Sequence, residues 1–195
     1  MPFIGLLYYS DVAYVSTTVF GASAYPKPRK GRYFLASPEL EDPNFRVALG
    51  LMLKSMSEAY ETNKVKNHQI VFKLGPTPQI LIDAGLPQLP VGLTGKVVDK
   101  CFFDHGVTKS MLEKVYHVIS VPRALYKSRN PEDATVVMSY DFRGTDPLIV
   151  AIHPNRQLGG RRDFYNHIAS YYFKENNPEV RWKNDGLLLW EEFKK

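Results

Sequence analysis

Between residues 43 and 64 the hydrophobic positions recur mostly three or four residues apart. Such spacing gathers apolar side chains on one side of an α-helix. Pro43 stands near the first turn of this segment, where proline fits because N–H groups there have no partner within the helix. The pattern therefore predicts an amphipathic helix whose apolar side is formed by Phe45, Val47, Leu49, Met52, Leu53, Met56 and Tyr60.

Three later segments also show helical spacing. Residues 97–103 and 110–119 are separated by a short polar stretch, in which Thr108 can cap the second helix. Helical spacing returns over residues 163–172, where Phe164, Ile168 and Tyr171 are expected on one side.

Other segments have the composition of strands. Residues 134–140 and 147–152 are apolar and β-branched, and the DFRGTD between them is typical of a hairpin loop. Shorter strands are expected at residues 68–73, at 187–190 and within the first 25 residues. Because helices precede strands along most of the chain, we predict an α+β fold, with a helical N-terminal part packed on a small antiparallel sheet.

The chain is expected to have two parts. Residues 1–72 would form an N-terminal extension that contains strands, a basic loop at Pro26–Gly31 and the amphipathic helix, packed on the main domain. Residues 73–195 would form that main domain.

Composition adds broad limits. With 195 residues, 44% of them hydrophobic and 13% aromatic, the chain can bury an ordinary core. A formal charge of +5 favours an anionic partner but is equally consistent with a solvated surface. The single cysteine, Cys101, excludes an internal disulfide and fits a reducing compartment, so we expect the cytoplasm. No apolar run approaches the length of a membrane-spanning helix, so no membrane partner is expected.

Six segments between Lys73 and Trp190 form a recognisable series. They are LGPTPQILIDAGLPQLP, DKCFFDHGVTKSMLEKV, VPRALYKS, VVMSYDFRGTDPLIVAIHPNR, NHIASYYFKEN and GLLLW. Their order and spacing resemble the MuF C-terminal toxin-like domain of phages and mobile elements. The resemblance implies a ribonuclease fold shared with barnase, EndoU, colicins E5 and D, and RelE.

The resemblance also implies a set of site residues. Family members often have a basic residue before the first histidine of the site and a glycine before the late lysine, whereas this chain has Asp104 and Phe173 there. A carboxylate close to the histidine would raise its pKa. The implied site consists of His105, Ser128, Asn166, Ser170, Tyr172 and Lys174.

These residue types suit RNA cleavage without metal. The reaction needs a base for the 2′-hydroxyl proton, an acid for the departing 5′-oxygen, and donors that stabilise charge on phosphorus. His105 could transfer protons. On a helix, Asn166, Ser170 and Lys174 would share one polar face that binds an anion. Phosphate contacts and base stacking are expected from Lys127, Arg129, Arg161, Arg162 and Tyr172.

The remaining candidates receive ordinary interpretations. His167 could also transfer protons, but His117 lies in an apolar helical stretch and reads as structural, and His153 as an exposed residue at a strand end. The QLGGRRD segment matches neither a nucleotide-binding P-loop nor a dinucleotide fingerprint. Because no histidine pair or carboxylate group has metal-ligand spacing, neither a metal nor a cofactor is expected.

The leading hypothesis is a phage- or mobile-element-associated ribonuclease-like toxin domain that cleaves RNA by metal-independent acid–base catalysis. The alternative is a non-catalytic binding or inhibitor protein of a mobile element that blocks a host protein or nucleic acid. RNA is the expected partner in the first case. A protein partner, either an immunity protein or a host target, is possible in both.

Overall fold

A computed structural model describes residues 41–62, 67–130, 133–140, 146–160 and 162–192, all within one compact unit of residues 32–195. The strands expected in the first 25 residues and the basic loop Pro26–Gly31 lie outside the described residues. None of the helices in these ranges has both the length and the apolar character needed to cross a membrane.

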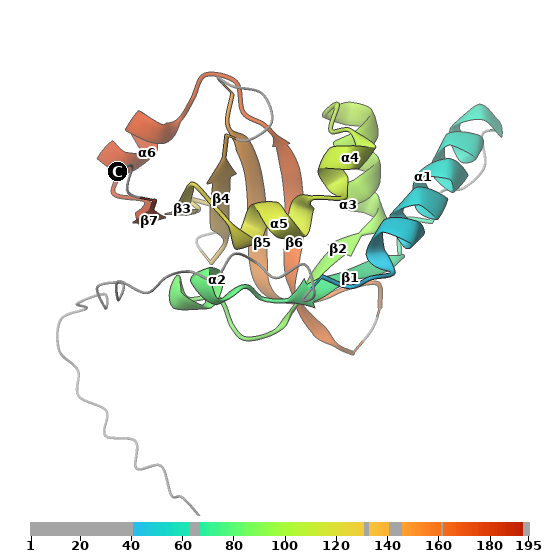
Figure 1. The fold of residues 1–195 in the computed structure, drawn as a ribbon, viewed down its shortest axis with the longest axis horizontal. Helices are drawn as coiled ribbons and strands as arrows, with labels where there is room; N and C mark the ends of the chain where they lie inside the picture. Colours follow the sequence, from blue (N-terminus) through green and yellow to red (C-terminus); the bar gives the residue numbers. More distant parts are fainter. Residues whose placement is uncertain (1–40, 63–66, 131–132, 141–145, 161, 193–195) are drawn as a thin grey trace, which may run out of the picture. The chain divides into compact units, whose positions relative to one another are not determined.

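A seven-stranded sheet forms the centre of this unit (Figure 1). Neighbouring strands are antiparallel except β2 and β6, which run parallel. The fold is α+β as predicted, but the sheet is mixed rather than antiparallel, because a long connection containing several helices joins β2 to the later strands. In spatial order the strands are β1 (Val71–Pro76), β2 (Pro90–Thr94), β6 (Phe164–Phe173), β5 (Leu148–Gln157), β4 (Thr135–Ser139), β3 (Ala124–Lys127) and β7 (Leu188–Glu191).

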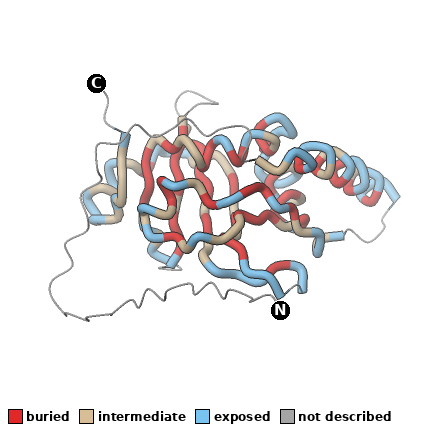
Figure 2. Tube along the Cα trace, turned by 60° about the horizontal axis from the view of Figure 1, so that its bottom comes forward, coloured by how far each residue is buried: buried red, intermediate tan, exposed pale blue. Residues whose placement is uncertain are grey.

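Most helices pack on one face of the sheet, called here the helix face. In Figure 1, α5 crosses in front of β5 and β6, and in Figure 2 the strands and the inner side of α1 are buried. Residues such as Leu125, Val150 and Tyr171 point from the strands into this main core. The helices are α1 (Phe45–Thr62), α2 (Gln79–Asp83), α3 (Gly95–Asp99), the π-helical η2 (Lys100–Asp104), α4 (Lys109–Leu112), α5 (Val115–Ser120) and α6 (Glu179–Asn184).

The opposite face of the sheet, called here the α6 face, has a smaller apolar cluster. Tyr126, Met138 and Ile149 point to this side, and Trp182 of α6 packs against the cluster. The two faces follow from the alternation of side chains along each strand.

Several predicted elements are confirmed. The amphipathic helix is α1, whose Phe45, Leu49 and Met56 are buried. Val47 and Tyr60, which were expected on the apolar side, are exposed. The segment 97–103 forms α3 and η2, and 110–119 forms α4 and α5. The predicted hairpin is β4 and β5, and the closing strand is β7.

Other expectations are wrong in detail. The segment 163–172 was expected to be a helix, but Phe164–Phe173 form strand β6. Strand β1 begins at Val71 and ends at Pro76, whereas a strand was expected at residues 68–73. The pattern also missed β2, β3 and α6, which are too short for their periodicity to stand out.

Gly92 in β2 illustrates how closely the sheet is packed, and it gives a test. A Cβ at Gly92 would come within 2.9 Å of both Leu158 Cδ1 and Tyr165 Cδ1. Gly92→Ala should therefore lower the free energy of unfolding by about 1–3 kcal/mol. Gly50 in α1 is the matched control, because its nearest neighbour would be the flexible end of Lys109 at 3.4 Å.

Gly50→Ala should raise the free energy of unfolding by about 0.5–1 kcal/mol, because alanine restricts the unfolded chain more than glycine. Urea denaturation of the two variants measures both changes. Equal effects of the two substitutions would contradict the packing described for β2.

Candidate functional site

One extra residue in β6 decides which side chains reach the α6 face. Ile168 pairs with Ile152 and Ser170 pairs with Ala151, so Ala169 is an insertion relative to β5. Such a bulge shifts the alternation of side chains by one position. His167 before the bulge and Ser170 and Tyr172 after it all point to the α6 face, while Ile168 and Tyr171 point into the main core.

Asn166 therefore lies on the other side of the sheet from Ser170. It is fully buried, and its Nδ2 donates to Thr77 Oγ1 and to Pro87 O, each at 2.7 Å. Its Oδ1 accepts from Asn155 N at 3.4 Å. These bonds satisfy the amide and tie the β1–β2 connection to β5 and β6. The predicted stripe of Asn166, Ser170 and Lys174 does not exist, since these residues are not on a helix.

His105 lies against Tyr172 because the helix before it is anchored in the core. Cys101 of η2 is buried; burial raises the pKa of its thiol to about 12, and a hydrogen bond from the Tyr171 backbone N–H counteracts part of this rise. The Tyr171 hydroxyl donates to Met111 O at 3.0 Å, which holds α4 at the same strand. The exposed His105 follows η2, and its ring centroid is 5.7 Å from that of Tyr172.

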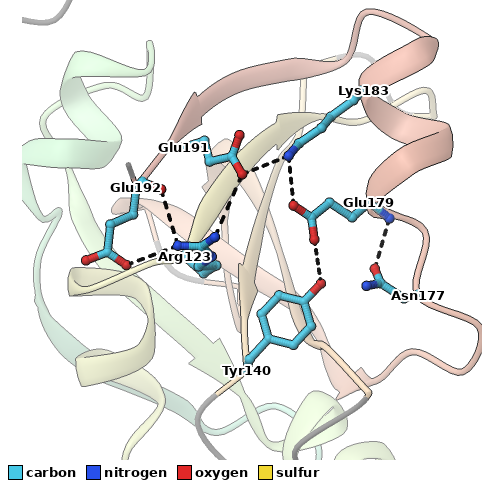
Figure 3. A network of polar contacts seen from close by, with 7 residues as sticks. All are labelled: Arg123, Tyr140, Asn177, Glu179, Lys183, Glu191 and Glu192. Carbon is cyan, nitrogen blue, oxygen red and sulfur yellow. Dashed lines mark hydrogen bonds and ion pairs between the residues drawn. The ribbon is translucent and has the colours of Figure 1, made fainter. Parts of the chain in front are cut away.

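Helix α6 covers the β3–β4 side of the α6 face. Trp182 packs edge-on against Tyr126 with a centroid distance of 5.1 Å. The helix is also held by charge: Lys183 binds Glu179 at 2.8 Å and Glu191 at 2.7 Å. Figure 3 shows that this network continues to Tyr140, Arg123 and Glu192.

The hydrogen bond from Lys183 lowers the pKa of Glu179. Partial burial of the carboxylate opposes this effect, and the hydrogen bond from the Tyr140 hydroxyl adds to it. The carboxylate therefore stays charged near neutral pH, and α6 stays over β3 and β4. Its position leaves the β5–β6 side of the face half-exposed, at Ala151, His153, His167, Ser170 and Tyr172.

Two histidines that sequence reasoning had not paired meet on this half-exposed side. His153 of β5 is directly opposite His167 of β6, with ring centroids 6.5 Å apart. Burial, with smaller effects of His153 and Arg156, lowers the pKa of His167 to about 4. Burial followed by Arg156 also lowers the pKa of His153, while Asp133 raises it. The strand predicted at residues 147–152 ends next to His153 and could have indicated where this residue lies. It could not have indicated His167 as the partner, because residues 163–172 were expected to form a helix.

The other predicted residues are dispersed. The backbone N–H of Ser128 donates to Ala134 O, which extends the pairing of β3 with β4. Because side chains alternate between the two faces and Tyr126 points to the α6 face, Ser128 lies on that face as well. Lys127 is exposed and by alternation belongs to the helix face. Arg129 forms a salt bridge with Asp185, whereas Arg162 is exposed in the β5–β6 turn. Arg161 lies outside the described residues.

Four of the predicted residues therefore gather at or near the end of β6. The residues on or beside the α6 face are His105, Ser170, Tyr172 and Lys174. Lys174 is included because the hydrogen bond from its backbone N–H to Pro147 O continues the pairing of β5 with β6. Ser128 shares the face but directly follows β3, which is two strands from β5. Within the described ranges, no group of three or more His, Cys, Asp or Glu side chains is arranged to hold a metal ion.

Asn166 gives a stability test of its structural role. Asn166→Ala removes the donor to Pro87 O and one of the two side-chain hydrogen bonds of Thr77, both in the interior, so the free energy of unfolding should fall by about 2–4 kcal/mol. The matched variant Ser170→Ala should change it by about 0.5 kcal/mol or less, because that side chain is only half-buried. Thermal or urea unfolding that ranks the two variants in the reverse order would refute this role.

His167 gives a second test, through pH. Its pKa in the folded protein, about 4, is below the ordinary value of 6.5, so protonation favours the unfolded chain. Stability should therefore be greatest above pH 6.5 and fall as the pH drops towards about 4. In His167→Gln, the fall in the free energy of unfolding over this pH range should be about 1–3 kcal/mol smaller than in the wild type. Urea unfolding across this pH range measures it, and an unchanged pH slope in the variant would contradict the burial of a neutral imidazole.

Comparison with known proteins gives one match. Residues 97–195, about half of the chain, match the family model of the phage MuF C-terminal domain. No curated protein and no solved structure matches the chain. The match begins within α3, so it includes η2, β3 to β7 and every predicted site residue, while the LGPTPQ segment precedes it. The resemblance seen in the sequence is thereby confirmed at the level of the family, and the chain belongs to the phage MuF C-terminal domain family.

Proposed function

We propose that this protein is a ribonuclease-like toxin domain of a phage or mobile element, which binds single-stranded RNA on the α6 face and cleaves it without metal. The observation that carries the proposal is the meeting of His105 with Tyr172, beside Ser170 and Lys174. The residue that follows η2 and those at or just after the end of β6 thus supply an imidazole, a phenol, a hydroxyl and an ammonium in one region. The barnase- and RelE-like fold implied by the family resemblance is part of the same proposal.

The chemistry assigns a task to each group. A neutral His105 removes the proton of the ribose 2′-hydroxyl, whose oxygen attacks phosphorus to form a 2′,3′-cyclic phosphate. The bond from phosphorus to the 5′-oxygen breaks, and the protonated His105 gives the proton that it has taken to that oxygen. Lys174 stabilises the charge that grows on the phosphoryl oxygens.

Tyr172 suits two further roles in this scheme. Burial raises the pKa of its hydroxyl, so the group stays protonated near neutral pH and can donate a hydrogen bond to the phosphate. Its ring can also stack against an unpaired base, which is how proteins commonly hold single-stranded RNA. The formal charge of +5 favours the approach of an anionic polymer.

A second function is favoured by one specific observation. Asn166, expected in the site, is buried on the opposite face, and Ser128 lies two strands away from β5. A set of residues that is only partly assembled suits a protein that binds a host protein or nucleic acid without cleaving it. This non-catalytic alternative makes the opposite prediction in the experiment below.

The decisive experiment incubates the full-length protein with labelled single-stranded RNAs in EDTA. The wild type should cleave them and leave 2′,3′-cyclic ends. His105→Gln and Lys174→Met should each slow cleavage by about 100-fold or more, because each removes a group that acts on the reacting atoms. His117→Gln is the matched control, since His117 is exposed on α5.

Unfolding curves of all variants should overlap, so that a loss of rate is not a loss of fold. The absence of cleavage by the wild type across RNAs of varied sequence would refute the proposal. Recovery of a stoichiometric host partner with intact RNA would then support the non-catalytic alternative.

A further inference from the structure

The β5–β6 part of the α6 face has larger side chains at its two ends and small ones between them. His153 and His167 form one end, and Tyr172 with the adjoining His105 forms the other. Between the ends, the α6 face of these two strands carries only the cross-strand pair Ala151 and Ser170. We call the five strand residues of this region the β5–β6 strip: Ala151, His153, His167, Ser170 and Tyr172.

The strip has the length of a short polymer segment rather than that of a single small ion. His167 and Tyr172 are separated by about four strand steps once the bulge is discounted, or about 13 Å. Each of the five residues is half-buried, so each exposes part of its surface to solvent with α6 in place. The aromatic end and the imidazole end differ in chemistry, which suggests that they hold different parts of one ligand.

The imidazole end has the surroundings of an anion site that is controlled by protonation. His153 is accompanied by Arg156, whose Nη2 donates to Asp133 Oδ2 at 2.7 Å, and by His167 across the strand pair. The guanidinium has further N–H donors beyond the one used for Asp133. His167 Nε2 is buried without a hydrogen-bond partner among the described residues, so this end contains an unsatisfied polar group.

A phosphate at this end would change the protonation of His153. Burial and Arg156 keep the free imidazole neutral near pH 7, and Asp133 opposes them in part. A bound phosphate adds negative charge beside the ring and therefore favours its protonated form. Binding and proton uptake are then coupled, so each strengthens the other.

We infer that the β5–β6 strip is a subsite for single-stranded RNA, in which a phosphate binds to His153 and Arg156 and a neighbouring base stacks on Tyr172. This inference rests on the proposed function for its choice of RNA as the ligand. It adds residues that the family resemblance did not imply, namely His153 and Arg156. It also orients the bound RNA along β5 and β6. The strip then holds the RNA beside His105 and Lys174.

The test measures binding, so it does not depend on cleavage. Inorganic phosphate and uridine 3′-monophosphate are titrated into the full-length protein while NMR follows the imidazole C–H signals. Both ligands should shift the signals of His153, and both should bind about tenfold more tightly at about pH 6 than at about pH 8, because binding takes up a proton. Uridine 3′-monophosphate should also shift the ring signals of Tyr172, and phosphate should not.

Variants assign the binding to the strip. His153→Gln should weaken phosphate binding about tenfold at about pH 6 and remove the preference for about pH 6 over about pH 8, while His117→Gln should leave both unchanged. Tyr172→Leu should weaken uridine 3′-monophosphate and spare inorganic phosphate. Because His153 is only half-buried, His153→Gln is expected to fold, and His153→Asn serves as a second variant if it does not.

The outcomes separate this inference from the proposed function. Phosphate binding that is indifferent to His153 substitution, or independent of pH, would overturn the subsite even if RNA is cleaved. Binding with the predicted pattern, in a protein that cleaves no RNA, would support the subsite and refute only the ribonuclease proposal.

Discussion

The bulge at Ala169 is the constraint on which the candidate site depends. One extra residue in β6 shifts the alternation of side chains, so that Ile168 and Tyr171 both enter the main core although they are three positions apart. Without it, Tyr172 would turn into the core and Tyr171 onto the α6 face. A bulge next to a functional surface is common, because it redirects a side chain while the strand pairing continues on both sides.

The bulge acts together with the π-helical segment η2. Beyond Ile168, β2 no longer pairs with β6, and η2 packs at this part of the strand. The π-helical turn places Cys101 in the core and ends just before His105, and Gly106, with φ of 63°, redirects the chain. Two irregularities, one in a strand and one in a helix, therefore bring His105 and Tyr172 together. Regular elements with the same residues would not produce this contact.

The same irregularities explain how far the sequence could predict the structure. The α1 helix, the β4–β5 hairpin and the α+β class follow from periodicity and turn chemistry, and the structure confirms them. β6 was mistaken for a helix for a physical reason: a bulge puts core residues three apart, as in Ile168 and Tyr171, and this imitates helical spacing. The parallel pairing of β2 with β6 joins segments about 70 residues apart, and no local pattern specifies it.

The structure brings part of the predicted site together. His105, Ser170 and Tyr172 follow from motif order, and the structure gathers them at one end of β6. Asn166 could not be recognised as structural, because its partners Thr77 and Pro87 are distant in sequence. His153 and His167 could not be recognised as a pair while one of their strands was taken for a helix. The sequence thus indicated which residues have suitable chemistry. The face of the sheet on which each residue lies depends on pairing between distant segments, which the sequence did not indicate.

The central claim is that RNA binds on the α6 face, and a footprint on the two faces tests it most directly. Amide hydrogen exchange is compared for the full-length protein with and without a short single-stranded RNA in which 2′-O-methyl groups block cleavage. The account predicts protection of β5, β6 and the η2–α4 connection, with no change on the outer side of α1. Protection confined to α1 or to other parts of the helix face, with none on β5 and β6, would contradict it.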